Sequence, residues 1–297
     1  MSEGVSSLSE FAATQGFFVG IDSDGCVFDS MEIKHKECFA PQFIKHFKLQ
    51  PVSKYAREVW EFVNLYSKSR GINRFPALSN ALNLLGDRPE VTARGVRPWN
   101  TEPLDDWLTR ETKLSNATHE QEIARGNAAL DQVLTWSRAV NAAIDDLVFG
   151  VPPFPLVRET LQRLAEVADV IVVSQTPTAA LEREWAEHDL ARYARLIAGQ
   201  ELGSKTDHLR LTAGGKYGPR RVLMIGDAPG DFKAARANYA LFYPVVPGRE
   251  EASWERLFGE ALDLFLNDQY AGDYEAALIE EFNASLPERP RWRTATG

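Results

Sequence analysis

The sequence predicts an α/β fold: a Rossmann-like, three-layer core around a parallel sheet, interrupted by an inserted all-helical cap domain. Two observations carry this prediction. Short apolar runs alternate with helix-like segments, which is the pattern of βαβ units on a parallel sheet. A long block between residues 30 and 150 contains helical stretches but no convincing strand. The length of 297 residues suits two domains, at roughly 100–200 residues each.

The core strands are predicted from runs that are apolar throughout, which is typical of strands buried on both faces. Four such runs lie at residues 17–21, 170–173, 222–225 and 240–243, and a fifth, less apolar candidate lies at 195–198. The intervening helices are expected at residues 156–167, 178–188, 206–212 and 231–238.

The inserted block defines the predicted domains. The core comprises residues 1–29 and 151–297, and the cap comprises residues 30–150. Prolines at the return to the core form a stiff connector. Cap helices are expected near 31–48, 53–67, 75–86, 102–116 and 127–147, and a helical tail from 253 to about 286 precedes a frayed end over 289–297.

Charge and cysteine content exclude several classes of protein. Asp and Glu outnumber Lys and Arg by 42 to 33, and the net charge of −9 argues against binding to nucleic acid or to anionic membranes. No stretch approaches about 20 consecutive apolar residues, so no membrane span is expected. The first residues lack the pattern of a signal peptide, and two cysteines are too few for a disulfide framework. We therefore expect a cytoplasmic protein.

Polar residues with related chemistry follow several predicted strands, where ligands gather in open α/β sheets. They are Asp22 and Asp24 after the first strand, Ser174 after the second, Lys205 before a helix, and Asp227 and Asp231 after the strand at 222–225. Carboxylates with one hydroxyl and one lysine suit a magnesium-assisted phosphoryl site, because Mg²⁺ prefers carboxylate, phosphate and water oxygens.

These residues resemble the four motifs of the haloacid dehalogenase superfamily. The first motif, DxDGxxxD, matches residues 22–29; Ser174 matches the second motif and Lys205 the third; the acidic pair GDxxxD matches residues 226–231. An insertion directly after the first motif resembles the helical C1 cap subclass, which includes β-phosphoglucomutase and phosphonatase. The resemblance covers residues 17–245 and implies the fold predicted above.

The resemblance implies a role for each motif residue. Asp22 is the nucleophile, and Asp24 is the general acid and base. Ser174 and Lys205 bind the transferring phosphoryl group. Mg²⁺ is held by the Asp22 carboxylate, the Asp24 backbone carbonyl and Asp227.

Three further motif-associated residues complete the predicted site. Asp231 is assigned to the metal site, where it is predicted to orient Lys205 or a metal-bound water rather than to contact the ion itself; simply charging the start of a helix is the alternative. Gly25 and Gln175 are predicted to line the substrate site. Lys216 is a rival to Lys205, but it falls in a glycine-rich turn.

Leaving-group contacts are predicted from a basic patch in the cap. Residues 30–100 carry 12 Lys and Arg against 6 Asp and Glu, and the densest patch places Gly71 between Arg70 and Arg74. Guanidinium groups bind carboxylates and phosphates well, so Arg70 and Arg74 are predicted to contact the substrate's leaving group. A solvated helix junction is the alternative interpretation.

The favoured function is a Mg²⁺-dependent phosphatase acting on a small phosphorylated metabolite through an aspartyl-phosphate. Asp24 favours phosphate chemistry, because family dehalogenases lack this second aspartate. Alternatives are a sugar phosphomutase similar to β-phosphoglucomutase, a phosphonate hydrolase, and a non-catalytic phosphate-binding relative. The sequence leaves a monomer or a homodimer open. Residues 203–206 do not complete a nucleotide-binding loop, and no GxSxG is present.

Overall fold

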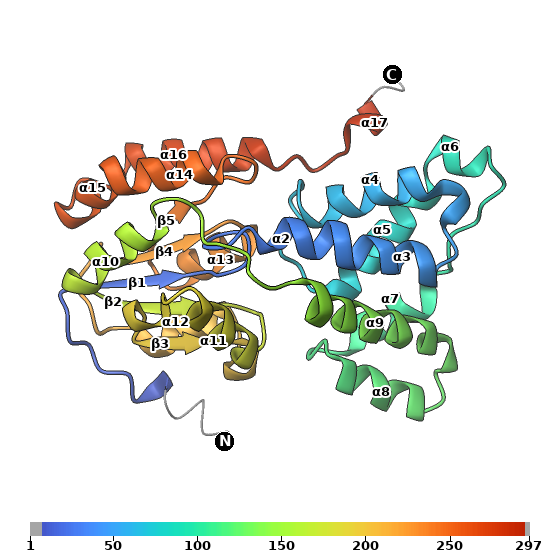
Figure 1. The fold of residues 1–297 in the computed structure, drawn as a ribbon, viewed down its shortest axis with the longest axis horizontal. Helices are drawn as coiled ribbons and strands as arrows, with labels where there is room; N and C mark the ends of the chain where they lie inside the picture. Colours follow the sequence, from blue (N-terminus) through green and yellow to red (C-terminus); the bar gives the residue numbers. More distant parts are fainter. Residues whose placement is uncertain (1–7, 295–297) are drawn as a thin grey trace. The chain divides into compact units, whose positions relative to one another are not determined.

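A parallel five-stranded sheet forms the centre of one of the two compact units of the chain (Figure 1). The computed structural model describes residues 8–294. The strand order is β3-β2-β1-β4-β5, so β1 is central. The strands are β1 (Phe17–Ile21), β2 (Ala168–Val173), β3 (Leu196–Ala198), β4 (Val222–Gly226) and β5 (Leu241–Pro244). Val19 lies opposite Val170 on one side and Leu223 on the other. The predicted α/β class is therefore confirmed.

Both faces of the sheet are buried, which explains why its strands are apolar throughout. Alternate residues such as Val19 and Val170 pack with Leu161 and Trp185 on one face. Their neighbours, such as Phe18, pack on the other face with the helices that carry Leu209 and Ala235. A fully buried aliphatic side chain contributes about 1.5–3 kcal/mol, so the two apolar layers hold the sheet together.

Helices cover both faces, which completes the three layers. On one face lie α10 (Val157–Val167), α11 (Thr178–Glu187), α14 (Glu250–Arg256) and α15 (Leu262–Leu266). On the other lie α12 (Lys205–Thr212) and α13 (Pro229–Ala237). Helix α16 (Asp273–Ser285) lies beside the edge strand β5, where the Phe242 amide donates to Glu275 Oε1 at 2.9 Å.

Asp169, at the start of β2, anchors the segment before β1. Its buried carboxylate accepts from Thr14 N at 2.8 Å, Gln15 N at 3.1 Å and Tyr217 Oη at 2.6 Å, and it pairs with Arg195 at 2.5 Å. Burial alone would raise the pKa of Asp169, but the hydrogen bonds from Thr14, Tyr217 and Gln15 lower it to about 2.

The chain divides into two compact units. The α/β unit contains Met1–Ser30 and Gly150–Leu286, and the helical unit contains Met31–Phe149 and Pro287–Gly297. The insertion boundaries therefore fall within one residue of the predicted ones. The described residues of the helical unit contain no strand. No helix within residues 8–294 has the length and apolar character needed to cross a bilayer.

Aromatic side chains form much of the core of the helical unit. Trp60 packs against Phe43, with ring centroids 5.0 Å apart, and against Trp136 at 5.7 Å. The helices that supply this unit are α2 (Ser30–Ile33, the first residue belonging to the α/β unit), α3 (Ala40–His46), α4 (Ser53–Asn64), α5 (Arg74–Gly86), α6 (Pro89–Thr92), α7 (Glu102–Arg110), α8 (Asn116–Ala124) and α9 (Asp131–Leu147).

Two predicted cap helices differ from the structure. The helix expected at 102–116 ends at Arg110, and α8 begins at Asn116. Ser115 caps α8, since its Oγ accepts from the Thr118 amide at 3.2 Å. A side chain that satisfies a free helical N–H favours a new helix start over continuation. The helix expected at 31–48 is interrupted by a π-helical turn, Lys34–Phe39.

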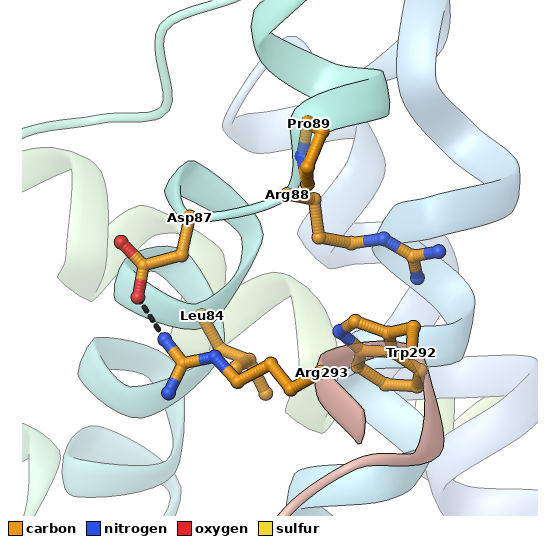
Figure 2. A pocket seen from close by; sticks show the side chains of 6 residues that line it. All are labelled: Leu84, Asp87, Arg88, Pro89, Trp292 and Arg293. Atoms are coloured by element: carbon orange, nitrogen blue, oxygen red, sulfur yellow. Dashed lines mark hydrogen bonds and ion pairs between the residues drawn. The ribbon is translucent and has the colours of Figure 1, made fainter. Parts of the chain in front are cut away.

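The C-terminal segment corrects the predicted domain assignment. Residues 287–297 were expected to belong to the core and 289–297 to fray. The described residues 287–294 instead group with the helical unit, and Arg291–Thr294 forms helix α17; residues 295–297 lie outside the described part of the chain. Trp292 packs edge-to-face on Phe62, with centroids 5.6 Å apart, and the Arg88 guanidinium lies 4.4 Å from the Trp292 ring. Figure 2 shows Arg293 paired with Asp87 beside them. These contacts of Trp292 hold α17 against the other helices of this unit.

Candidate active site

A tight loop follows β1 and presents the first motif. The Ser23 carbonyl accepts from the amides of Val27 at 2.8 Å and Phe28 at 3.2 Å, and Gly25 adopts a positive φ of 74°. Two indoles tie the loop to the surrounding helices: Trp185 Nε1 donates to Ser23 Oγ at 2.9 Å, and Trp254 Nε1 donates to the Cys26 carbonyl at 2.8 Å. Ser23 Oγ also donates to Glu184 Oε2 at 3.3 Å. The backbone on both sides of Asp24 is therefore held in place.

Lys205 lies against two of the predicted carboxylates. Its Nζ is 2.5 Å from Asp22 Oδ2 and 2.6 Å from Asp231 Oδ1. Lys205 is the first residue of α12, and Ser204 caps that helix by accepting from the Asp207 amide at 3.2 Å. The rival Lys216 instead donates to the backbone carbonyls of Phe11 and Leu211. The structure therefore brings Lys205, and not Lys216, to Asp22.

The Asp231 side chain packs directly against Gly226. A Cβ added at Gly226 would lie 2.4 Å from both Cβ and Cγ of Asp231, so only glycine leaves room for this carboxylate. Asp231 Oδ2 accepts from the Ala228 amide at 3.0 Å, and Oδ1 accepts from Lys205. With both oxygens engaged, Asp231 is better placed to hold Lys205 than to bind a cation directly.

Asp22, Asp227 and Asp231 form a cluster that could hold a metal ion. One oxygen from each lies within 4.8 Å of the others, and all three residues are buried. Carboxylate oxygens are the hard donors that Mg²⁺ prefers. The Asp22 and Asp227 carboxylates therefore fit the predicted ion, while Asp231 lies beside them with its own oxygens held by Lys205 and the Ala228 amide. The carbonyl ligand expected from Asp24 stays a prediction.

The electrostatics of the cluster favour a bound cation. Burial raises the pKa of Asp22 to about 6, although Lys205 opposes the shift. Burial also raises the pKa of Asp231, with Lys205 opposing the rise and the Asp227 carboxylate adding to it. Burial alone would lower the pKa of Lys205, but the facing Asp22 and Asp231 carboxylates raise it. Two buried carboxylates face this one ammonium group and Asp227 adds a third buried carboxylate to the cluster, so a divalent cation would relieve their repulsion.

Asp24 is held by two hydroxyl groups that the sequence did not indicate. Thr176 Oγ1 donates to Asp24 Oδ2 at 2.8 Å, and Ser30 Oγ donates to Asp24 Oδ1. Thr176 lies two residues after Ser174, in the turn between β2 and α11, and Ser30 is the first residue of α2. In the sequence, these contacts could have been suspected only because Ser30 directly follows the first motif and Thr176 lies two residues after Ser174.

Ser174 follows β2 at the same edge of the sheet as Asp22. The pairing of Ile21 with Val172 places the residues that follow these strands side by side, with neighbouring strands about 4.8 Å apart. Ser174 is buried, and its Oγ accepts from the Thr176 amide at 3.3 Å. The side-chain Nε2 of Gln175 donates to the carbonyls of Ser174 at 3.2 Å and Gly203 at 3.0 Å. Substrate contact by Ser174, Gln175 and Gly25 stays a prediction.

Arg70 and Arg74 both make contacts inside the helical unit. Arg70 is 3% exposed and donates to the Leu65 carbonyl at 3.0 Å. Arg74 Nη1 donates to Asn141 Oδ1 at 2.6 Å and to Ser137 Oγ at 3.1 Å, and burial lowers the Arg74 pKa to about 10. Both guanidinium groups therefore have hydrogen-bond partners within the helical unit. Their contact with a leaving group stays a prediction.

Comparisons with known proteins find solved structures of low sequence identity to this chain. No protein-family model and no curated protein matches the chain. Similar solved structures include a predicted phosphoglycolate phosphatase from Haemophilus somnus, with 16% identity, a TM-score of 0.44, and coverage of 78% of this chain and 86% of that one. A haloacid dehalogenase-like hydrolase from Streptococcus pneumoniae has 15% identity, a TM-score of 0.42, and coverage of 90% and 98%. A haloacid dehalogenase-superfamily hydrolase of subfamily IA from Geobacter sulfurreducens has 17% identity, a TM-score of 0.39, and coverage of 79% and 89%.

Proposed function

We propose that this protein is a Mg²⁺-dependent phosphatase of the haloacid dehalogenase type that hydrolyses a small phosphorylated metabolite through an aspartyl-phosphate at Asp22. One observation carries the proposal. A buried carboxylate at the end of the central strand faces Lys205 at 2.5 Å within a cluster of acidic side chains. This arrangement supplies a nucleophile, a cation for the phosphoryl oxygens and donors for a metal ion.

The first half of the reaction breaks the phosphate ester. An oxygen of Asp22 attacks phosphorus, the bond between phosphorus and the leaving oxygen breaks, and Asp24 gives its proton to that oxygen. The facing Lys205 ammonium opposes the rise that burial causes in the pKa of Asp22, and so favours the ionised carboxylate that attacks. Lys205 stays protonated and stabilises negative charge on the phosphoryl oxygens.

The second half restores the enzyme. Asp24, now a carboxylate, takes a proton from water as the water oxygen attacks phosphorus. The bond between phosphorus and the Asp22 oxygen breaks, and inorganic phosphate leaves. Asp231 keeps Lys205 in place throughout, because its own oxygens are held by Lys205 and the Ala228 amide.

Asp22, Asp227 and the Asp24 carbonyl would hold Mg²⁺. When bound, the ion offsets the repulsion between the anionic nucleophile and the phosphate dianion.

A cytoplasmic location, with a monomeric or homodimeric state, completes the proposal. Cys26 and Cys38 are both buried free thiols, as a reducing compartment allows.

The test is phosphate release from p-nitrophenyl phosphate and from a panel of phosphorylated metabolites, with Mg²⁺ and with EDTA. We expect Mg²⁺-dependent turnover that Asp22→Asn abolishes while the variant keeps its circular dichroism spectrum. Acid quenching during turnover should leave one phosphoryl group on the peptide that contains Asp22. No turnover across the panel, or an active Asp22→Asn variant, would refute the proposal. A phosphomutase would instead yield a phosphorylated isomer of a sugar phosphate.

A further inference from the structure

The two carboxylate oxygens of Asp24 accept hydrogen bonds from hydroxyl groups in different parts of the α/β unit. Thr176, in the turn after β2, donates to Oδ2 at 2.8 Å, and Ser30, at the start of α2, donates to Oδ1. We propose that Thr176 is a positioning residue that holds Asp24 for proton transfer in both halves of the reaction. This inference rests on the proposed function and adds to it a residue outside the four motifs.

The backbone of Thr176 is itself fixed, so its hydroxyl is presented from a rigid turn. The Thr176 amide donates to Ser174 Oγ at 3.3 Å, and its carbonyl accepts from the Gln200 amide at 3.0 Å. These contacts join the ends of β2 and β3 to Asp24. Rotation of the Asp24 carboxylate would break its bond to Thr176 or to Ser30, so the pair restricts the direction in which its oxygens point.

A hydroxyl group suits a residue whose partner changes protonation state. Asp24 must lose a proton to the leaving oxygen and later gain one from water. A threonine hydroxyl can donate to a carboxylate and can accept from a carboxylic acid, whereas a backbone N–H can only donate. Each carboxyl oxygen also has two lone-pair positions, so Oδ2 can accept from Thr176 at one while the proton for the leaving oxygen occupies another position on the carboxyl group.

This role predicts a dependence on the leaving group. A phenolate without a nitro group is a poor leaving group and needs the proton of Asp24. A p-nitrophenolate departs as a stable anion and needs it less. The value of kcat/KM reports the step in which the ester bond breaks, so loss of Thr176 should lower kcat/KM more for phenyl phosphate than for p-nitrophenyl phosphate.

The experiment compares Thr176→Val, which keeps the shape and removes the hydroxyl, with Thr176→Ser, which restores it. Thr178→Val is the matched control, because the Thr178 hydroxyl donates to Glu201 at 2.8 Å from the same end of α11. Each variant is assayed with both aryl phosphates in Mg²⁺, and its thermal midpoint is recorded. Thr176→Ala replaces Thr176→Val should the latter not fold.

For Thr176→Val we expect kcat/KM to fall about 10- to 100-fold with phenyl phosphate and several-fold less with p-nitrophenyl phosphate. Thr176→Ser should recover most of the loss, and Thr178→Val should match the wild type. Equal losses on both substrates, a loss of less than twofold, or no recovery with serine would overturn the inference while leaving the phosphatase assignment intact. A wild-type protein inactive on both aryl phosphates and across the panel of phosphorylated metabolites would overturn the proposed function and this inference with it.

Discussion

The ammonium group of Lys205 lies 2.5 Å from Asp22 Oδ2, and both side chains are largely removed from solvent. Lys205 also reaches Asp231, so one cation serves two buried carboxylates. A buried charge without its partner is costly, because the low dielectric of the interior weakens its solvation. This relationship connects the stability of the core to the chemistry proposed for it.

Replacing Lys205 with methionine should therefore destabilise the protein by about 3–5 kcal/mol, since two carboxylates lose their counter-charge. Urea denaturation in EDTA measures the effect. Lys216→Met is the control, because that lysine is half-buried and donates only to carbonyl groups. Adding Asp231→Asn to Lys205→Met should recover part of the loss. A free energy of unfolding within about 1 kcal/mol of wild type would contradict a coupled role.

Magnesium should stabilise the protein in the absence of substrate. At a concentration 100 times the dissociation constant, an ion that binds only the folded state adds about 2.7 kcal/mol, or a few degrees in the thermal midpoint. Asp227→Asn should abolish most of this shift, whereas the exposed Asp146→Asn in α9 should preserve it. Differential scanning fluorimetry with and without EDTA makes the comparison. An unchanged Mg²⁺ shift in Asp227→Asn would exclude Asp227 as a ligand.

Asp169 should make the fold sensitive to strong acid. Its pKa of about 2 lies below the ordinary value of 3.8, so the folded state stabilises the ionised carboxylate relative to the carboxylic acid. The resulting stabilisation, about 2 kcal/mol, is present above pH 3.8 and is lost as the pH falls through 2. Asp169→Asn should reduce stability at pH 7 and flatten the decline between pH 4 and 2. Tyr217→Phe, which removes one donor, should have a smaller effect; an equally steep decline in Asp169→Asn would contradict this account.

Trp292 should stabilise the helical unit although it lies near the end of the chain. Its contacts with Phe62 and Arg88 predict a loss of about 1–3 kcal/mol in Trp292→Ala. Trp292→Phe should be close to neutral, because the buried Nε1 finds no hydrogen-bond partner among residues 8–294. Hydrogen exchange in α4 and α5 locates the effect. Faster exchange in β1 and β4, with unchanged exchange in α4 and α5, would contradict a stabilising role of Trp292 in the helical unit.

Much of the candidate site could be predicted from sequence because parallel strands end at a shared edge. The apolar runs before Asp22 and Asp227 marked two buried strands, and the acidic pairs directly after them had to lie close together once β1 and β4 paired. Lys205 was harder to place, since Lys216 offered the same charge in the same interval. The structure separates the two lysines, because Lys205 contacts Asp22 and Asp231 whereas Lys216 donates to backbone carbonyls.

The amino-acid sequence alone determined the fold class, the insertion after the first motif, and the charged residues at the strand ends. Apolar periodicity and residue type carry this information locally. Tertiary structure alone decided that Thr176 reaches Asp24 across 152 positions, that Arg74 bonds to Asn141, and that the C-terminal segment packs on the helical unit. Such contacts depend on ångström-scale geometry between distant segments, and a single threonine, arginine or tryptophan leaves no periodic signal along the chain.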